Sequence, residues 1–273
     1  MIKFRPNRVD RKNNNTPILS DSEIDDLAEM LLADYKPRLL KEPQEINYLH
    51  FLESYLGANI AFEDIYYEEG EQPIFGATSF NTEYMKVFDR ENMCIKAIKL
   101  ESRTIVIDNY VMMEGKEGLA LFTALHEAGH LWIHPGVFTK ISGQISMFRD
   151  MEISPIVCCR RSSIENFGKK KSLETAKDFR EHHADYFASA IAMPKSTFIP
   201  LAKEIIKAEG ISDNIVIEDL DIEHNWFANE EFPNKISKVY GVSKQAAYIK
   251  LRKFGFITDT NTQKVQNKQL KLL

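Results

Sequence analysis

The sequence predicts an α+β fold, in which helices enclose a small mixed or antiparallel sheet and a helical hairpin follows near the end. Apolar residues recur at helical spacing over 20–36, 43–56, 116–133 and 172–192, whereas short β-branched and aromatic runs dominate residues 59–112. The chain has 273 residues, of which 44% are hydrophobic, so it is long enough to bury a substantial core.

Local signals place the ends of the first two helices. Ser20 and Glu23 have the spacing of a capping box, and Pro37 stops the apolar stripe that follows them. Gly57 ends the second helical stretch. Helical spacing also predicts a helix over 196–208 and two short helices near the end of the chain.

The central part of the chain is predicted to form a small sheet. The four expected strands lie at 60–62, 74–77, 95–98 and 104–108. Residues 108–112 are expected to form an edge strand, which would hold an extended peptide by main-chain pairing.

Composition divides the chain into five parts. Residues 1–18, rich in Asn and Arg, are predicted to be a flexible arm, and 19–210 the main globular domain. An acidic linker is expected over 211–233, a helical hairpin subdomain over 234–258, and a basic tail over 259–273.

The composition also restricts the setting of the protein. No apolar run approaches the 18 or so residues of a membrane span and the start is polar, so the chain is expected in the cytoplasm without a membrane partner. Three cysteines, Cys94, Cys158 and Cys159, are expected as reduced thiols. The net charge is −5, but the last 39 residues hold nine Lys or Arg against one Asp, which indicates either a solvated end or an acidic or nucleic-acid partner.

One motif predicts metal chemistry. Residues 126–130 read His-Glu-Ala-Gly-His within an apolar helical stretch. An α-helix turns about 100° per residue, so His126 and His130 project from one face and can bind the same ion. Glu127 is offset from that line and is placed to act as a general base toward water activated by the metal. The alternative is a core helix with two incidental histidines.

A second helical stretch supplies a candidate third ligand. Glu181 shares a helix face with Ala188 and Ala192, where a carboxylate is costly to bury unless it is paired or binds metal. It completes a set of two His and one Glu, with the fourth position open to water. Asp185, one turn on, is predicted to accept the other ring N–H of a ligand histidine, although a surface acid is the alternative.

Other side chains compete for roles at this site. His134 lies one turn beyond His130, but three ligands in a row on a straight helix do not converge on one ion. His182 is predicted to stabilise the oxyanion of the tetrahedral intermediate. The neighbouring Cys158 and Cys159 are candidates for a second metal site, for which no matching Cys pair exists.

These residues resemble the ImmA/IrrE family of metallo-endopeptidases. The resemblance is carried by residues 126–130, 181–194 and 236–257, in this order and at similar spacing, and it covers about 116–257. It implies a zincin-like core, one zinc ion per chain, Glu181 as the third ligand and a helix-turn-helix-like C-terminal subdomain.

The resemblance also implies a function. Members of the family are similar in cleaving helix-turn-helix repressors, which switches on stress-response or mobile-element genes, so a repressor is the implied protein substrate. Two departures limit the comparison. The connection over 135–171 is longer than is common in the family, and the first 115 residues are only vaguely similar.

Two further functions remain open from the sequence. One is a metal-bound regulatory or anti-repressor protein with latent or no proteolysis; the presence of Glu127 favours the peptidase, because metal binding alone needs no base. The other is direct DNA binding by residues 235–257, whose few basic side chains favour packing or substrate docking instead. Manganese or iron would also fit two His and one carboxylate.

Overall fold

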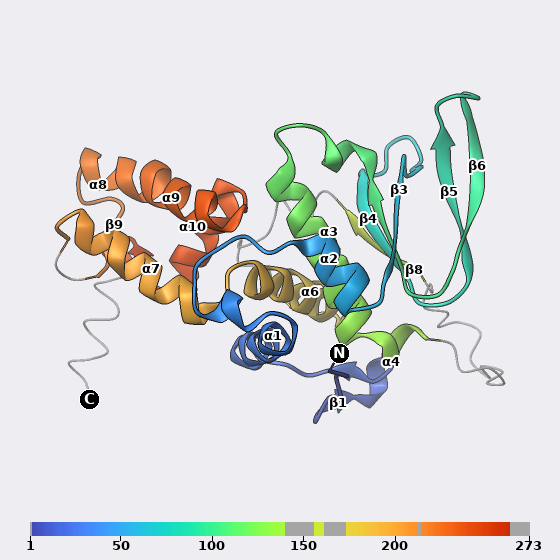
Figure 1. The fold of residues 1–273 in the computed structure, drawn as a ribbon, viewed down its shortest axis with the longest axis horizontal. Coiled ribbons are helices and arrows are strands. Elements are labelled where there is room, and N and C mark those ends of the chain that lie inside the picture. Colours follow the sequence, from blue (N-terminus) through green and yellow to red (C-terminus); the bar gives the residue numbers. More distant parts are fainter. Residues whose placement is uncertain (1, 140–155, 161–172, 212–213, 263–273) are drawn as a thin grey trace.

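The computed structural model describes residues 2–139, 156–160, 173–211 and 214–262. Helices and small sheets combine in an α+β arrangement, as the sequence predicted. In Figure 1 the strands of the main sheet and of one hairpin lie on the right, the C-terminal helices lie on the left, and helix α3 (Glu117–Ile133) runs beside the sheet.

The main sheet is mixed and has the strand order β3-β7-β4-β8. β3 is parallel to β7, whereas β4 is antiparallel to both β7 and β8. The strands span Asn59–Glu63 (β3), Thr104–Asp108 (β7), Ile74–Ser79 (β4) and Ile156–Arg160 (β8). The sequence predicted the first three of these and did not predict β8.

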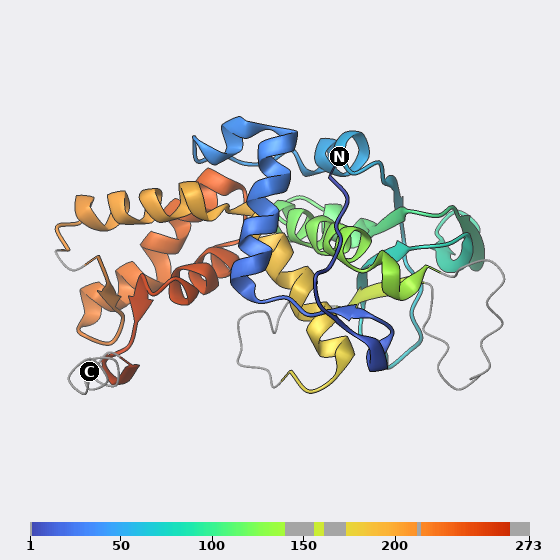
Figure 2. The same cartoon turned by 90° about the horizontal axis from the view of Figure 1, so that it is seen from below.

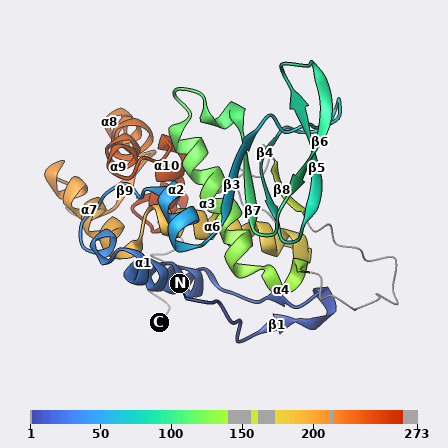
Figure 3. The same cartoon turned by 45° about the vertical axis from the view of Figure 1, so that its right-hand side comes forward.

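A separate hairpin projects beyond the main sheet. β5 (Glu83–Asp89) and β6 (Cys94–Leu100) pair along their whole length, and Figure 3 shows them extending from the sheet edge. The predicted run at 95–98 is part of β6, whereas β5 was not predicted, because its apolar residues lie in two adjacent pairs separated by Lys86 rather than in one run or in strict alternation.

The prediction of an edge strand at 108–112 was wrong. β7 lies inside the sheet and pairs on both sides, and Asn109–Met112 forms a 3-10 turn. The carboxylate of Asp108 accepts hydrogen bonds from the backbone N–H groups of Tyr110 and Ile65. The first of these caps the 3-10 turn, so the chain leaves the strand direction after Asp108. Among the described strands of the main sheet, the edge strands are β3 and β8.

The predicted helices are present where their capping signals lie. α1 (Asp21–Tyr35) begins at the capping box of Ser20 and Glu23, and α6 (Ala176–Ala192) begins at a second box formed by Thr175 and Asp178. The stretch predicted over 43–56 divides into α2 and a π-helical turn. These and the next helices span Tyr48–His50 (α2), Phe51–Tyr55 (π turn), Pro135–Phe138 (α4) and Lys195–Ala208 (α7).

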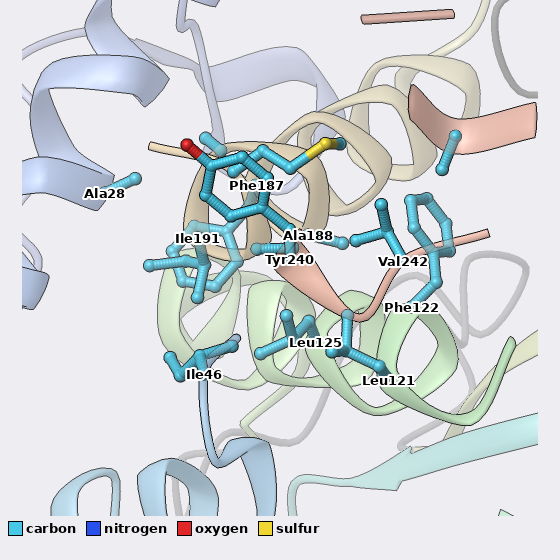
Figure 4. Close-up of a cluster of buried hydrophobic side chains, with 14 of the residues drawn as sticks. Ala28, Ile46, Leu121, Phe122, Leu125, Phe187, Ala188, Ile191, Tyr240 and Val242 are labelled. Carbon is cyan, nitrogen blue, oxygen red and sulfur yellow. The ribbon is translucent and has the colours of Figure 1, made fainter. Parts of the chain in front are cut away.

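The core lies where α3 crosses α6. Figure 2 shows the two helices close together, and Figure 4 shows apolar side chains from both, including Leu125 and Ile191, packed with Tyr240. A Cβ at Gly129 of α3 would lie 3.0 Å from Cα of Ala184 in α6. Gly129 therefore allows a close approach of the two backbones, which positions the side chains described below.

Part of the segment predicted to be a flexible arm, residues 1–18, contacts the folded protein. β1 (Val9–Asp10) pairs with β2 (Thr16–Pro17), and residues before them cover Trp132 of α3. Trp132 Nε1 donates to the Ile2 carbonyl at 2.9 Å, and the Phe4 ring lies 5.1 Å from the indole. An aromatic residue at the end of α3 thus orders a polar segment that has no periodicity of its own.

Most of the predicted acidic linker over 211–233, namely residues 211 and 214–233, is part of the folded structure. β9 (Val216–Ile217) pairs with β10 (Ile257–Thr258), and Phe227 and Phe232 are buried and stack at 5.3 Å. The remaining elements of this stretch are α8 (Ile222–Trp226) and a π turn at Phe227–Glu231. The many acidic residues of this stretch predicted a linker, although Phe227 and Phe232 between them are buried.

The C-terminal helical hairpin packs on the rest of the protein. α9 (Phe232–Tyr240) and α10 (Lys244–Lys253) are joined at Gly241, whose φ of +65° suits a residue without a Cβ. Most of the predicted basic tail, residues 263–273, lies outside the described residues. Across the described ranges, no helix combines the length and apolar character needed to cross a bilayer.

Candidate metal centre

The crossing of α3 and α6 brings the three predicted ligands together. His126 Nε2 lies 3.1 Å from His130 Nε2, 3.6 Å from Glu181 Oε2, and His130 Nε2 lies 3.7 Å from Glu181 Oε1. Both imidazoles are fully buried, and the Glu181 side chain is 14% exposed. Three donor atoms from two helices therefore converge on one point.

The donor set fits a divalent cation such as zinc. Tetrahedral zinc with N and O ligands at about 2.0–2.1 Å separates neighbouring donor atoms by about 3.4 Å, close to the three distances described above. Glu181 Oε2 is buried without a hydrogen-bond partner among the described residues. Burial raises the pKa of the Glu181 carboxyl, and a bound cation would offset that cost.

Each ligand histidine is oriented through its other ring nitrogen. His126 Nδ1 lies 2.8 Å from Asp185 Oδ1, the contact predicted for Asp185 from helical spacing. His130 Nδ1 lies 3.1 Å from His134 Nδ1, and His134 in turn reaches His183 at 3.4 Å. His134 thus lies behind the ligand set rather than in it.

The surroundings of His130 and His134 favour their neutral forms. Burial, together with the neighbouring imidazole rings, holds the pKa of both His130 and His134 well below the usual value. A neutral imidazole is the form that binds metal. The sequence missed the role of His134, although its position one turn after His130 was the available signal.

Glu127 is buried beside the ligand set and held by two donors. The Thr78 hydroxyl donates to Oε2 at 2.5 Å, and the backbone N–H of Cys159 donates to Oε1 at 3.2 Å. Burial raises the pKa of the Glu127 carboxyl to about 7, while His126 and the Thr78 hydrogen bond act in the opposite direction. β4 approaches closely here: a Cβ at Gly76 would lie 3.0 Å from Glu127 Cγ.

Cys159 is the second residue that the sequence did not place at this centre. It is fully buried, and donor atoms of His126, Glu127 and Cys159 all lie within 4.8 Å of one another. Burial raises the pKa of the Cys159 thiol to about 11, with His126 lowering it. The sequence predicted no strand at β8, so it indicated only a separate metal site for Cys158 and Cys159 and did not place Cys159 beside Glu127.

His182 lies outside the ligand set. Its Nε2 is 2.7 Å from Asp21 Oδ1, so the ring faces α1, and no described hydrogen bond or ion pair joins it to His126, His130 or Glu181. This contact argues against the predicted oxyanion role for His182. It makes the residue part of the α1–α6 packing instead.

No protein-family model matches this chain, and no curated protein matches it. What α3 and α6 define by themselves is a buried group of two histidines and one carboxylate that could hold a metal ion, with a second carboxylate, Glu127, beside it.

Proposed function

We propose that this protein is a zinc-dependent endopeptidase with a zincin-like core, in which His126, His130 and Glu181 bind the metal and Glu127 is the general base. The observation that carries the proposal is the convergence of three donor atoms at spacings suited to a tetrahedral ion, next to a buried carboxylate. A metal site without hydrolytic function has no need for Glu127 at that position.

The protein groups around the site have separate tasks in this mechanism. A bound zinc ion would supply Lewis acidity toward the scissile carbonyl and the attacking water. Glu127 takes the proton from that water and passes it to the leaving amine. Thr78 orients the Glu127 carboxylate, and Asp185 fixes the tautomer of His126 so that Nε2 faces the metal.

The substrate class follows from the sequence resemblance to the ImmA/IrrE metallo-endopeptidases. We propose a helix-turn-helix repressor as the substrate, whose cleavage derepresses stress-response or mobile-element genes in the cytoplasm. The three segments at 126–130, 181–194 and 236–257 support this, because two of them supply the ligand set and the third forms α9 and α10.

The C-terminal hairpin supports packing or substrate docking rather than DNA binding. Its basic side chains are engaged within the protein: Lys244 pairs with Glu230 at 2.6 Å, Lys253 pairs with Asp21 at 2.6 Å, and Arg252 pairs with Glu218. Each pair removes a charge that contact with DNA phosphates would use.

A regulatory protein without proteolysis is the alternative function. It is favoured by one observation: both carboxylate oxygens of Glu127 already accept hydrogen bonds, from Thr78 and from Cys159. These hydrogen bonds stabilise the ionised carboxylate and make it a weaker base toward water. In that case the protein would bind metal and act on a repressor by association alone.

The test compares the natural protein with Glu127→Gln for zinc content and for cleavage of a co-encoded helix-turn-helix repressor. We expect about one zinc per chain in both proteins and a fall in cleavage rate of about 10²- to 10⁴-fold in Glu127→Gln. Glu117→Gln is the matched control, because Glu117 is an exposed carboxylate at the start of the same helix.

The outcomes separate the two functions. Zinc in both proteins with cleavage in neither would favour the regulatory protein. Equal cleavage by both would remove Glu127 as the base, and absence of zinc from the natural protein would overturn the metal site itself.

A further inference from the structure

Cys159 contacts both halves of the proposed catalytic machinery. Its thiol lies beside the proposed ligand His126, and its backbone N–H donates to the proposed base Glu127 at 3.2 Å. The sulfur lies with donor atoms of those two residues in a group whose members are within 4.8 Å of one another. One residue of β8 therefore lies beside both the proposed ligand and the proposed base.

The strand register explains why Cys159, and not Cys158, is in this place. β8 is antiparallel to β4, with Cys159 opposite Gly76 and Cys158 opposite Ala77. Gly76 faces α3, since a Cβ there would meet Glu127, so side chains at its level point to the centre. Cys158 points to the other face, where it packs against a smaller apolar cluster.

The space that Cys159 occupies is the one that hydrolysis requires. His126, His130 and Glu181 provide three donors and leave one position of a tetrahedral ion open. Glu127 acts on a water molecule only if that open position faces its carboxylate. The thiol lies on this side, and thiolate sulfur is among the strongest zinc ligands in proteins.

We propose that Cys159 is the fourth ligand of the same ion and that β8 thereby keeps the enzyme latent. This inference rests on the proposed function. The thiol gives up its proton to solvent as the sulfur–metal bond forms, as ligation by cysteine requires. Water then has no coordination position, and the hydrogen bond from the Cys159 N–H keeps Glu127 engaged at the same time.

Two features of the structure bear on this closed state. Glu181 Oε2, buried and without a partner among the described residues, independently points to a cation at the centre. The Cys159 sulfur groups with His126 and Glu127 but not with His130 and Glu181, so ligation draws β8 toward the ion. A substrate that displaces Cys159 would open the fourth position and free Glu127 together.

The test uses Co²⁺ alone as a spectroscopic probe in the full chain. The natural protein, Cys159→Ala and Cys159→Ser are each loaded with Co²⁺, and the near-ultraviolet thiolate-to-cobalt charge-transfer band is measured along with the visible cobalt bands. We expect the charge-transfer band in the natural protein and its loss in both variants, with visible bands retained. Cys158→Ala is the matched control and keeps the band, because Cys158 lies on the opposite face of β8.

A second readout is metal selectivity. Because thiolate is a soft ligand, both Cys159 variants should lose more affinity for zinc than for manganese, whereas Cys158→Ala should not change the ratio. Cys159→Ser is close in size to cysteine, so the same unfolding curve for its metal-free form as for the natural metal-free protein shows that the fold is retained.

The results distinguish failure of this inference from failure of the proposed function. Visible cobalt bands without a charge-transfer band in the natural protein would overturn ligation by Cys159 and leave the His126, His130 and Glu181 site intact. Absence of bound cobalt would overturn both. Faster repressor cleavage by Cys159→Ala than by the natural protein would support latency, and a rate no higher than the natural one would overturn it.

Discussion

Helix α6 takes part in two buried polar arrangements, one toward each end, and they differ in kind. Toward its N-terminus, Glu181 meets His126 and His130 of α3, so three donor atoms face one another. Toward its C-terminus, the Ser189 carbonyl accepts a hydrogen bond of 3.0 Å from the ammonium group of Lys250 in α10. The ring centroids of Phe198 and Phe254 lie 5.6 and 5.4 Å from the same nitrogen.

The difference shows that convergence of donors, rather than burial of charge, marks a metal site. The Lys250 ammonium group is stabilised by one backbone carbonyl and by two aromatic rings, all within the protein. Its burial still carries a desolvation penalty. The Glu181 group is incomplete, because one carboxylate oxygen is buried without a partner among the described residues. The first arrangement therefore calls for an ion, and the second does not.

The largest expected effect is the loss of stability on metal removal. A metal that binds only the folded state adds about 4 kcal/mol to the free energy of unfolding when it is present at about a thousand times its Kd. A chelator should lower the melting temperature of the natural protein accordingly and should have little effect on Glu181→Gln.

The matched control for that experiment is Glu204→Gln, which changes an exposed carboxylate on α7. It should respond to the chelator as the natural protein does. If Glu181→Gln loses as much stability as the natural protein on chelation, the ion does not bind at the α3–α6 crossing and the contrast between the two ends of α6 disappears.

Lys250→Met should stabilise the protein near neutral pH. Burial lowers the pKa of Lys250 to about 7; Asp25 and Glu29 of α1 act to raise it, and Lys253 acts to lower it. In the unfolded chain the pKa of lysine is about 10.4. Between pH 7 and about pH 10.4 the unfolded chain therefore binds more protons than the folded chain, so the free energy of unfolding rises with pH over this range. Removing the amine should abolish that rise and add on the order of 2 to 3 kcal/mol at or below pH 7.

Urea unfolding at about pH 7 and about pH 9 measures this prediction. Lys244→Met, at an exposed position of the same helix, should keep the pH dependence of the natural protein. If the stability of Lys250→Met still rises between these two pH values, another group causes the pH dependence. Burial of Lys250 beside the C-terminal end of α6 would then not be what destabilises the protein at neutral pH.

Asp185→Asn should weaken metal binding without abolishing it. The carboxylate holds His126 through Nδ1, and loss of such an orienting contact typically lowers metal affinity about 10- to 100-fold, or about 1.4 to 2.7 kcal/mol. Competition with a chromophoric chelator measures the change. Asp26→Asn, which alters an exposed acid paired with Lys195, should leave the affinity unchanged, and an equal loss in both variants would exclude a specific role for Asp185.

Local patterns were sufficient for the helices and for half of the centre. The capping box of Ser20 and Glu23 and the helical spacing of the two motifs act between neighbouring residues, so they placed α1, α3 and α6 correctly. The positions of His126, His130, Glu181 and Asp185 followed from the same periodicity. The packing of residues 2–17 and of Phe227 and Phe232 did not follow from local patterns, because it depends on distant aromatic partners such as Trp132 and on burial of phenylalanines within acidic surroundings.

The sequence by itself determined which side chains share a helix face, because a turn of about 100° per residue is a property of the backbone. It therefore named the proposed metal ligands and the proposed base before any tertiary contact was known. Only the tertiary structure decided that Gly129 lets α3 and α6 approach closely enough for the donors to meet, that His134 supports His130, and that the register of β8 on β4 brings Cys159 to the centre. These are distances between segments far apart in the chain, and they are set by packing rather than by local pattern.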